Sequence, residues 1–337
     1  MLMRALVTGA TGGLGRNLVE RLHRDGHDVI ATGRNRAVGQ AIASEGIRFE
    51  AVDLAEDQRL QTLSEGCDVV FHCAALSSPW GRREDFEAIN VNGTINVRDA
   101  ALAAGARLVH VSTPSIYANF SDQLNISEFS LLPKRKINDY ARTKWEAEAH
   151  IDLSVRNEGL EAIIIRPRGI FGPYDTTLMP RLMATAERGP VPLINGGQAV
   201  VDVTYVENVV DALILAAEAR HIKHGEAFNI TNGEAVVIAD LIKQALTAVG
   251  VPYTTKNVPY WLANLVARGM EFSARIGAIK GEPALTRYTA GLFAFDQTLD
   301  ITRARTNLGY SPRISIKEGI ARYAEWYRLD RFRGQQG

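Results

Sequence analysis

Cysteine is scarce in this chain of 337 residues: Cys67 and Cys73 are the only two, and they flank an apolar run at residues 69–71. Two cysteines in that setting indicate buried thiols rather than a disulfide framework, which favours a reducing compartment. The seven histidines show no spacing that would gather three metal ligands. We therefore predict that the chain binds no metal.

An excess of one charge is also absent, because 38 basic residues balance 38 acidic ones. No global field would draw the chain to nucleic acid, so we expect no nucleic-acid partner. The first residues lack the pattern of a signal peptide, and no apolar run approaches the length of a transmembrane helix. These absences favour a cytoplasmic protein that acts on a small molecule.

Short β-branched runs alternate with helix-like segments through the first half of the chain, at residues 5–8, 28–32, 49–52, 69–73, 108–112 and 162–166. This alternation predicts an α/β fold with a Rossmann-type, doubly wound parallel sheet. Between the first two runs, Leu14, Leu18 and Leu22 recur every four residues and Gly26 follows them. That spacing predicts a helix packed on the sheet and ending near Gly26.

Prolines and glycines break the alternation after Arg166, where we expect the chain to leave the sheet and begin a smaller lobe. Residues 201–204 and 227–230 still resemble strands, which predicts a return to the first domain near residues 200–230. The predicted organisation is a sheet domain over residues 1–166 and a mainly C-terminal, substrate-binding lobe from residues 167–199 and 231–330.

A glycine-rich turn lies between the first predicted strand and the first predicted helix. Its glycines permit a tight turn and let backbone N–H groups approach a pyrophosphate, which the helix N-terminus stabilises. An ordinary strand-to-helix turn is the plainer alternative, but the strand before it and the leucine stripe after it favour a dinucleotide cofactor. The predicted cofactor-binding residues are Gly9, Thr11, Gly12, Gly13, Leu14 and Gly15.

Tyr140 and Lys144 are four residues apart and follow Asn138, a predicted helix cap, so both side chains should lie on one helical face. A neighbouring ammonium lowers the pKa of a phenol, which lets the phenol oxygen exchange a proton with a substrate hydroxyl or carbonyl. A core tyrosine next to a solvated lysine is the alternative that chance would give.

Five further motifs, together with the glycine spacing, resemble the short-chain dehydrogenase/reductase superfamily over nearly the whole chain. They are Asp53-Leu54, His72-Cys73-Ala74-Ala75, Asn90-Val91-Asn92-Gly93-Thr94, Tyr140-Ala141-Arg142-Thr143-Lys144 and Arg166-Pro167-Arg168-Gly169-Ile170-Phe171-Gly172-Pro173. The resemblance implies that Asp53 and Leu54 border the adenine. It also implies that Ala74 and Ala75 line the cofactor, and that the backbone around Pro167 touches the nicotinamide end.

The resemblance assigns further roles around the predicted catalytic pair, which the family also places against the cofactor. When residues 111–117 are aligned on Tyr117, the catalytic hydroxyl of the family falls on Thr113, with Ser112 and Ser115 as lower-ranked neighbours. Thr113 would hold the substrate oxygen and help to orient Tyr140. Asn90 matches the residue that the superfamily often uses to hold a helix bend and a proton-relay water.

The cofactor preference depends on Gly33 and Arg34, at the end of the second predicted strand. NAD-preferring relatives carry an acid at the position of Gly33, where it bonds both ribose hydroxyls and would repel a 2′-phosphate. A guanidinium can instead pair with that phosphate through a bidentate fork. We therefore predict NADP, bound in part by Arg34. NAD is the alternative if Arg34 and Arg36 are only solvated loop charges.

Residues 202–212, 300–304 and 308–312 resemble the extended branch of the superfamily, in which two subgroups compete. Nucleotide-sugar enzymes commonly carry an Arg where this chain has Val201, and sugar dehydratases carry two acids where it has Pro114 and Ser115. Residues 258–288 and 78–81 instead resemble the 3β-hydroxysteroid dehydrogenase-like and 2-alkyl-3-oxoalkanoate reductase-like subgroup. The segment 259–279, rich in apolar residues, is read as a core-facing helix, a substrate lid or a membrane-surface contact.

The resemblance leads to one main functional hypothesis. The chain is expected to be an NADP-dependent oxidoreductase that interconverts a secondary alcohol and a ketone on a largely apolar substrate, a 3-oxo or 3-hydroxy acid or a steroid-like compound. Tyr140 would be the acid/base, Lys144 would tune it and Thr113 would position the oxygen. The alternatives are a nucleotide-sugar epimerase and an NADP-binding sensor without catalysis, and a homodimer is left open.

Overall fold

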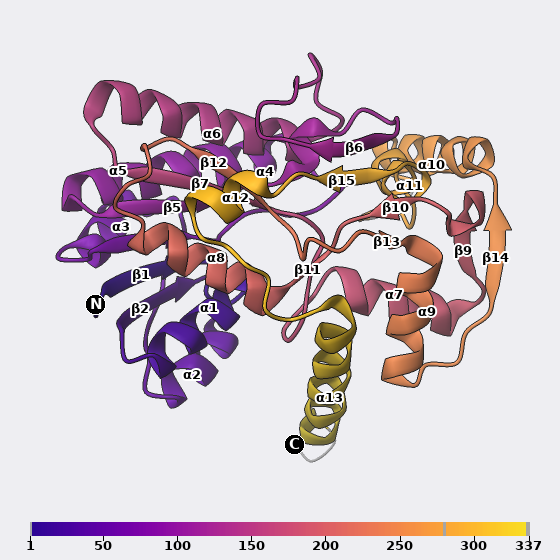
Figure 1. Cartoon of the computed structure of the whole chain (residues 1–337), viewed down its shortest axis with the longest axis horizontal. Helices are drawn as coiled ribbons and strands as arrows, with labels where there is room; N and C mark the ends of the chain where they lie inside the picture. Colours follow the sequence, from indigo (N-terminus) through magenta and orange to yellow (C-terminus); the bar gives the residue numbers. More distant parts are fainter. Residues whose placement is uncertain (1, 279–280, 335–337) are drawn as a thin grey trace.

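A seven-stranded parallel sheet forms the centre of the larger lobe in the computed structural model, which describes residues 2–278 and 281–334 (Figure 1). Its strands run in the order β12-β7-β5-β4-β1-β2-β3. Their bounds are β1 (Arg4–Thr8), β2 (Asp28–Gly33), β3 (Arg48–Ala51), β4 (Val69–His72), β5 (Arg107–Val111), β7 (Ala162–Pro167) and β12 (Ala227–Ile230). The predicted Rossmann-type, doubly wound sheet is therefore confirmed.

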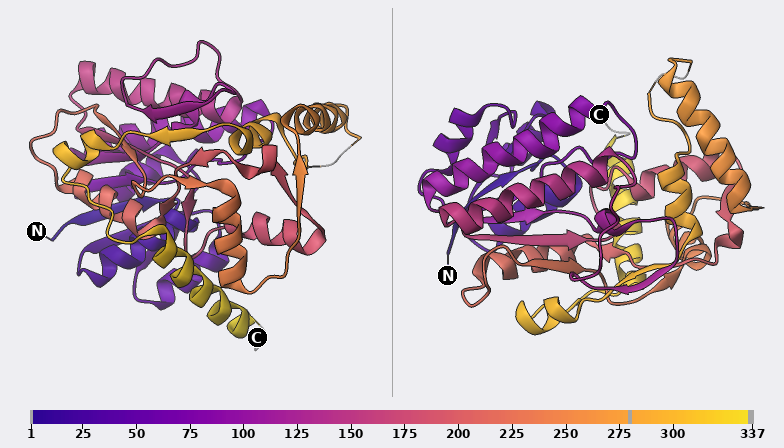
Figure 2. Two further views of the ribbon diagram at one scale, coloured as in Figure 1. Left: turned by 45° about the vertical axis from the view of Figure 1, so that its right-hand side comes forward. Right: turned by 90° about the horizontal axis from the view of Figure 1, so that it is seen from above.

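Helices cover both faces of this sheet because its strands are apolar on both sides. In β1, Ala5 and Val7 belong to one core and Leu6 belongs to the other. The first core takes its helical side chains from α1 (Gly13–Arg24), α2 (Arg36–Ser44), α8 (Val206–Glu218) and α12 (Thr302–Asn307). The second takes them from α3 (Asp57–Ser64), α5 (Gly93–Ala104) and α6 (Asp139–Glu158), and these layers are visible in Figure 2.

The helix predicted between the first two strands is α1. Leu18 and Leu22 are fully buried against the sheet, whereas Leu14 is only partly buried. The helix ends at Arg24, and Gly26 follows with φ +86°, a left-handed conformation that glycine adopts without strain. The leucine spacing therefore predicted both the helix and its end correctly.

The smaller lobe is built around a four-stranded sheet with the order β13-β10-β15-β6 and two separate strand pairs, β11-β8 and β14-β9. Its strands are β6 (Gln123–Ile126), β8 (Ile170–Phe171), β9 (Val191–Ile194), β10 (Val200–Val201), β11 (Thr204–Tyr205), β13 (Val236–Val237), β14 (Thr255–Val258) and β15 (Gln297–Leu299). Its helices are α7 (Leu178–Arg188), α9 (Ile238–Val249), α10 (Tyr260–Arg275), α11 (Arg287–Ala294) and α13 (Ile316–Gly334). Shorter turns are α4 (Arg83–Phe86), η1 (Glu87–Asn92), η2 (Pro114–Tyr117) and η3 (Asn195–Gly197).

Two details of the strand assignment differ from the sequence prediction. The strand expected at residues 201–204 is divided between β10 and β11, and neither joins the seven-stranded sheet. The expected return near residues 200–230 is present and is made by α8 and by β12, the strand predicted at residues 227–230. Strand β6 lies within residues 1–166 but pairs with β15 of the smaller lobe. Pairing with a distant segment leaves no local sequence signal, so the pattern could not reveal these partners.

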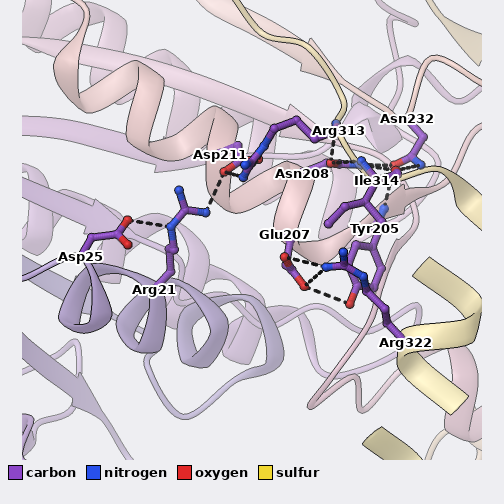
Figure 3. Close-up of polar contacts among 10 residues, drawn as sticks. All are labelled: Arg21, Asp25, Tyr205, Glu207, Asn208, Asp211, Asn232, Arg313, Ile314 and Arg322. Carbon is purple, nitrogen blue, oxygen red and sulfur yellow. Dashed lines mark hydrogen bonds and ion pairs between the residues drawn. The ribbon is translucent and has the colours of Figure 1, made fainter. Parts of the chain in front are cut away.

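Polar side chains on α8 hold the C-terminal part of the chain against the sheet domain (Figure 3). Asp211 accepts hydrogen bonds from Arg21 of α1 at 2.9 Å and from Arg313 at 2.7 Å. Glu207 forms an ion pair with Arg322 of α13 at 3.1 Å. These polar residues of the extended-branch motif at 202–212 therefore serve the architecture of the molecule.

Helix α10 lies at the outer edge of the smaller lobe (Figures 1 and 2) and exposes large apolar residues while it buries small ones. Ala263 packs in a cluster with Ala290 of α11, and Ala267 is fully buried. The exposed side chains are Trp261, Leu262, Leu265, Val266, Phe272 and Ile276. The core-facing reading is therefore wrong for these residues, and Ile279 lies outside the described residues. No helix in the described part of the chain has the length and apolarity to cross a membrane.

Candidate active site

The glycine turn packs its backbone directly against the chain that follows β4. Gly9 has φ +72°, and a Cβ on it would lie 2.6 Å from the backbone nitrogen of Ala74. A Cβ on Gly15 would lie 2.2 Å from the carbonyl oxygen of Gly9. Side chains are thus excluded where the turn meets the N-terminus of α1, which suits the close approach of a pyrophosphate. This turn contains Gly9, Thr11, Gly12, Gly13, Leu14 and Gly15.

The other residues predicted to bind cofactor follow the same edge of the sheet. Asp53 and Leu54 come after β3, Ala74 and Ala75 come after β4, and Pro167 ends β7. The carboxyl edge of an open α/β sheet is where such folds bind their ligands. The structure therefore brings together, at one edge, positions that are far apart in the sequence, and their arrangement fits a dinucleotide.

Gly33 and Arg34 lie beside this turn. A Cβ on Gly33 would lie 2.7 Å from the hydroxyl oxygen of Thr11, so an acidic side chain at position 33 would displace Thr11. The side chain of Arg34 is 66% exposed, and its Nη1 lies 4.0 Å from Oδ2 of Asp53. An ion pair at that distance and exposure is weak, which leaves the guanidinium able to bind an anionic ligand.

Tyr140 lies in the first turn of α6. Asn138 caps this helix by accepting a hydrogen bond from the backbone N–H of Ala141 at 2.8 Å, as its sequence position predicted. The Tyr140 side chain is partly buried, and the hydroxyls of Thr113 and Ser77 lie close enough to its phenol to favour the phenolate. Desolvation of the phenol outweighs these two neighbours and raises the pKa of Tyr140, the opposite of the lowering that the sequence predicted. The predicted proximity of Thr113 to Tyr140 is present.

Lys144 is almost completely buried, and its ammonium is held by the end of β5. The Nζ atom donates to the carbonyl oxygen of Val111 at 2.7 Å and lies 3.0 Å from Nε2 of His110. Burial lowers the pKa of Lys144 to about 8, although the Glu148 carboxylate partly opposes the shift. His110, to which the sequence assigned no role, therefore contacts the predicted catalytic lysine.

His72 lies next to His110, with their ring centroids 5.2 Å apart. Its Nδ1 is 2.8 Å from the hydroxyl of Thr8, and its Nε2 is 2.9 Å from the hydroxyl of Thr94. Burial, and secondarily the charge of Lys144, lower the pKa of His72 to about 3, so this ring is neutral near neutral pH. The histidine of the His72-Cys73-Ala74-Ala75 motif thus links β1, β4 and α5.

Asn90 lies in η1, a π-helical turn that leads into α5. Its side chain accepts from the backbone N–H of Leu76 at 2.7 Å and donates to the hydroxyl of Thr143 at 3.1 Å. A helix irregularity at Asn90 agrees with the bend that the resemblance implied. The contacts tie the segment after β4 to α6, one residue before Lys144.

Arg166, the first residue of the Arg166–Pro173 motif, anchors α6 to β7. Its Nε donates to Glu148 of α6 at 2.9 Å, and its Nη1 donates to the hydroxyl of Tyr117 at 2.5 Å. Both members of the Arg166–Glu148 ion pair are buried, and the Glu148 carboxylate holds the pKa of Arg166 far above its ordinary value despite burial. This pair sets the position of the helix that carries Tyr140 and Lys144.

A row of hydroxyl groups extends from Tyr140 into the smaller lobe. Thr113 Oγ1 donates to Ser115 Oγ at 2.9 Å, and Ser115 Oγ lies 2.6 Å from the phenol oxygen of Tyr288 in α11. The sequence reading did not assign roles to Ser77 or Tyr288, and it ranked Ser115 low. Ser77 directly precedes the segment 78–81, and Tyr288 is the last residue of the segment 258–288. The resemblance of these two segments to the 3β-hydroxysteroid dehydrogenase-like subgroup was the sequence signal for both residues.

Comparison with known proteins identifies relatives along almost the whole chain. The profile described as "NAD dependent epimerase/dehydratase family" matches residues 5–231. The protein YbjS of Escherichia coli is 39% identical over 97% of this chain and 98% of its own. A 2-alkyl-3-oxoalkanoate reductase of Shewanella oneidensis is 33% identical over 94% of this chain and 84% of its own. The solved structure of MoeE5 with UDP-glucose and NAD is 26% identical, covers 97% of this chain and 99% of its own, and gives a TM-score of 0.75.

Proposed function

The chain belongs to the NAD dependent epimerase/dehydratase family and is an NAD(P)-dependent oxidoreductase. We propose that it interconverts a secondary alcohol and a ketone on a largely apolar substrate, using NADP(H). The observation that carries this proposal is the closeness of the Thr113 hydroxyl to the Tyr140 phenol, one helical turn before the buried Lys144. These are the three groups needed to hold an alcohol or carbonyl oxygen and to exchange its proton.

In the proposed reaction, Thr113 and Tyr140 hold the substrate oxygen between them. A bound nicotinamide supplies or accepts the hydride at the carbon. During reduction the phenol oxygen of Tyr140 gives its proton to the carbonyl oxygen, and during oxidation it takes the hydroxyl proton. Lys144, whose ammonium is held by Val111 and His110, lies one helical turn after Tyr140, and in this proposal its charge tunes the phenol.

An apolar substrate is supported by the surroundings of this site. A small pocket of about 20 Å³ lies beside Tyr288, and its lining includes the apolar side chains of Phe120, Ile137, Leu292 and Phe295. Burial of apolar ligand surface there contributes about 25 cal/mol per Å². The relative from Shewanella oneidensis is named for a reductase of 2-alkyl-3-oxoalkanoates, compounds of this apolar kind. We therefore favour a 3-oxo or 3-hydroxy acid, or a steroid-like compound.

A nucleotide-sugar epimerase is the second candidate, because MoeE5, a protein of the same fold, binds UDP-glucose. Against it stand Val201, which is buried where such enzymes commonly carry a diphosphate-binding Arg, and Pro114 and Ser115, which replace the acids of the dehydratases. A buried diphosphate without enough cationic partners would carry a desolvation cost of several kcal/mol.

The NADP preference is supported by Gly33, which cannot bear an acid without displacing Thr11, and by the exposed guanidinium of Arg34. A cytoplasmic setting is supported by the two free cysteines, Cys67 and Cys73, since burial raises the pKa of both thiols and keeps them protonated.

The test of the proposed chemistry is single-turnover hydride transfer with Tyr140→Phe. The variant should transfer hydride about 10² to 10⁴-fold more slowly and still bind NADPH, because only the exchangeable proton is removed. Tyr310→Phe is the matched control, since it removes another buried phenol hydroxyl, one that donates to the carbonyl oxygen of Thr231 at 2.9 Å. Near-wild-type hydride transfer by Tyr140→Phe would contradict the assignment.

A further inference from the structure

Arg168 is a buried cation that lacks the partners other buried arginines have. Its relative exposure is 8%, and its Nε has no hydrogen-bond partner among the residues the structure describes. Arg166, two residues earlier, is paired with Glu148, and Arg16 is paired with Glu20. Burying a guanidinium without a carboxylate is costly, so a protein retains such a group chiefly where a ligand completes it.

The position of Arg168 places it at the candidate active site. It directly follows Pro167 at the carboxyl end of β7, and β7 pairs with β5, the strand that leads to Thr113. Its charge lies within electrostatic range of Tyr288, whose phenol oxygen is 2.6 Å from Ser115 Oγ. Ser115 in turn accepts from Thr113. Tyr288 therefore lies between Arg168 and the hydroxyls of Ser115 and Thr113.

Asp202 is the acidic residue within range of Arg168, but it is already engaged elsewhere. Its Oδ2 accepts the backbone N–H of Leu299 at 2.7 Å, which fixes the carboxylate to β15. In the part of the chain that the structure describes, no ion pair within 4.0 Å joins Arg168 to Asp202. Asp202 therefore offsets part of the Arg168 charge but leaves the Nε donor without a hydrogen-bond partner among the described residues.

We propose that Arg168 binds a carboxylate of the substrate, next to the oxygen held by Thr113 and Tyr140. The inference rests on the proposed function and narrows it to hydroxy and oxo acids. A guanidinium fork matches a carboxylate in a bidentate manner. In a 3-hydroxy acid the carboxylate lies two bonds from the reacting carbon, which suits two neighbouring binding groups. During oxidation, hydride passes from C3 to NADP⁺, the hydroxyl proton passes to Tyr140, and the carboxylate is unchanged.

The experiment compares a 2-alkyl-3-hydroxyalkanoate with its methyl ester, both oxidised with NADP⁺. Wild type should prefer the acid by at least about tenfold in kcat/KM, because the ester cannot form the charge-assisted pair. Arg168→Met should lose that preference. Its kcat/KM for the acid should fall, chiefly because KM rises, while its kcat/KM for the ester stays unchanged. Arg168→Lys should restore part of the preference, since it returns the charge without the fork.

Stability separates a binding role from a structural one. Since Arg168 is buried without a hydrogen-bonded partner, Arg168→Met should leave the urea midpoint of unfolding unchanged or raise it. An equal loss of activity on acid and ester together with a lowered urea midpoint would show a structural role and overturn the inference. Equal kcat/KM values for acid and ester in wild type would overturn it as well.

A binding measurement separates this inference from the proposed function. Tryptophan fluorescence of the NADP⁺ complex is titrated with dodecanoate and with dodecanol, using wild type and Arg168→Met. If wild type binds dodecanoate more tightly than Arg168→Met does, and the two proteins bind dodecanol equally, the carboxylate site is supported. Absence of oxidation of both hydroxy substrates would then reject the proposed oxidation but not the carboxylate site. Equal binding of dodecanoate by the two proteins would reject the carboxylate site.

Discussion

Three ionisable side chains, His72, His110 and Lys144, lie close together in the interior, and Lys144 belongs to α6, the helix that also carries Tyr140. The His72 and His110 rings are neighbours, and the Lys144 ammonium contacts His110. Burial lowers the pKa of all three, most of all for the two histidines. A neutral pair of imidazoles beside Lys144 leaves the lysine as the single group of the three that can carry charge near neutral pH. That charge is carried one helical turn after Tyr140 in α6.

We predict that stability falls with acid in a way that depends on His72. Its folded pKa, about 3, lies below the ordinary value of 6.5. Its contribution to stability is therefore fully present above pH 6.5 and is lost as the pH falls toward 3. Between about pH 7 and pH 5 the free energy of unfolding should fall by roughly 2 kcal/mol on account of this residue. Urea unfolding at both pH values measures the change.

The comparison uses His72→Gln, which should unfold with a smaller dependence on pH than wild type because it removes one titrating group. His23→Gln is the matched control, since His23 is exposed. If His72→Gln and His23→Gln show the same pH dependence as wild type, the assignment of a strongly depressed pKa to His72 is wrong.

We also predict tighter binding of NADPH than of NADH, with the difference residing in Arg34. Removal of a bidentate contact to a 2′-phosphate should weaken NADPH binding by about tenfold to a hundredfold and leave NADH binding unchanged. Titration of both cofactors against wild type, Arg34→Ala and the neighbouring control Arg36→Ala measures this. A wild type without preference, or a preference that survives Arg34→Ala, would count against NADP.

At the scale of the elements, the sequence predicted α1, α6 and the parallel strands because each leaves a local signal: the leucine spacing, the Asn138 cap and the β-branched runs. It did not predict that His110 holds Lys144, since that contact joins β5 to α6 and depends on tertiary packing. The pairing of β6 with β15 joins residues far apart in the sequence. Such long-range partners are set by tertiary packing.

Helix α10 shows where apolar composition misleads. We predict that Leu265→Ser and Phe272→Ser each change the free energy of unfolding by no more than about 0.5 kcal/mol, because both side chains are more than half exposed. Ala267→Leu, at a fully buried position, should cost about 1 to 3 kcal/mol through overpacking. Urea unfolding followed by circular dichroism measures all three variants. A large loss in the serine variants would show that this face is covered.

At the scale of the whole molecule, the candidate site lies where the two lobes meet. The sheet domain supplies the glycine turn, Thr113, Tyr140 and Lys144, and the smaller lobe supplies Tyr288 through its contact with Ser115. The sequence could propose cofactor-binding positions because their motifs are short and local. The substrate half was not predictable, because it is assembled from segments that meet only in the folded chain.

The measurement that tests the account most directly offers the purified protein two substrate sets with NADPH or NADP⁺. One set contains apolar 3-oxo and 3-hydroxy compounds, and the other contains UDP- and dTDP-sugars. Cofactor absorbance reports net redox turnover, and product analysis detects epimerisation that consumes no cofactor. The account predicts net oxidation or reduction of the apolar compounds. Efficient epimerisation of a nucleotide sugar, with no turnover of any apolar alcohol or ketone, would contradict it.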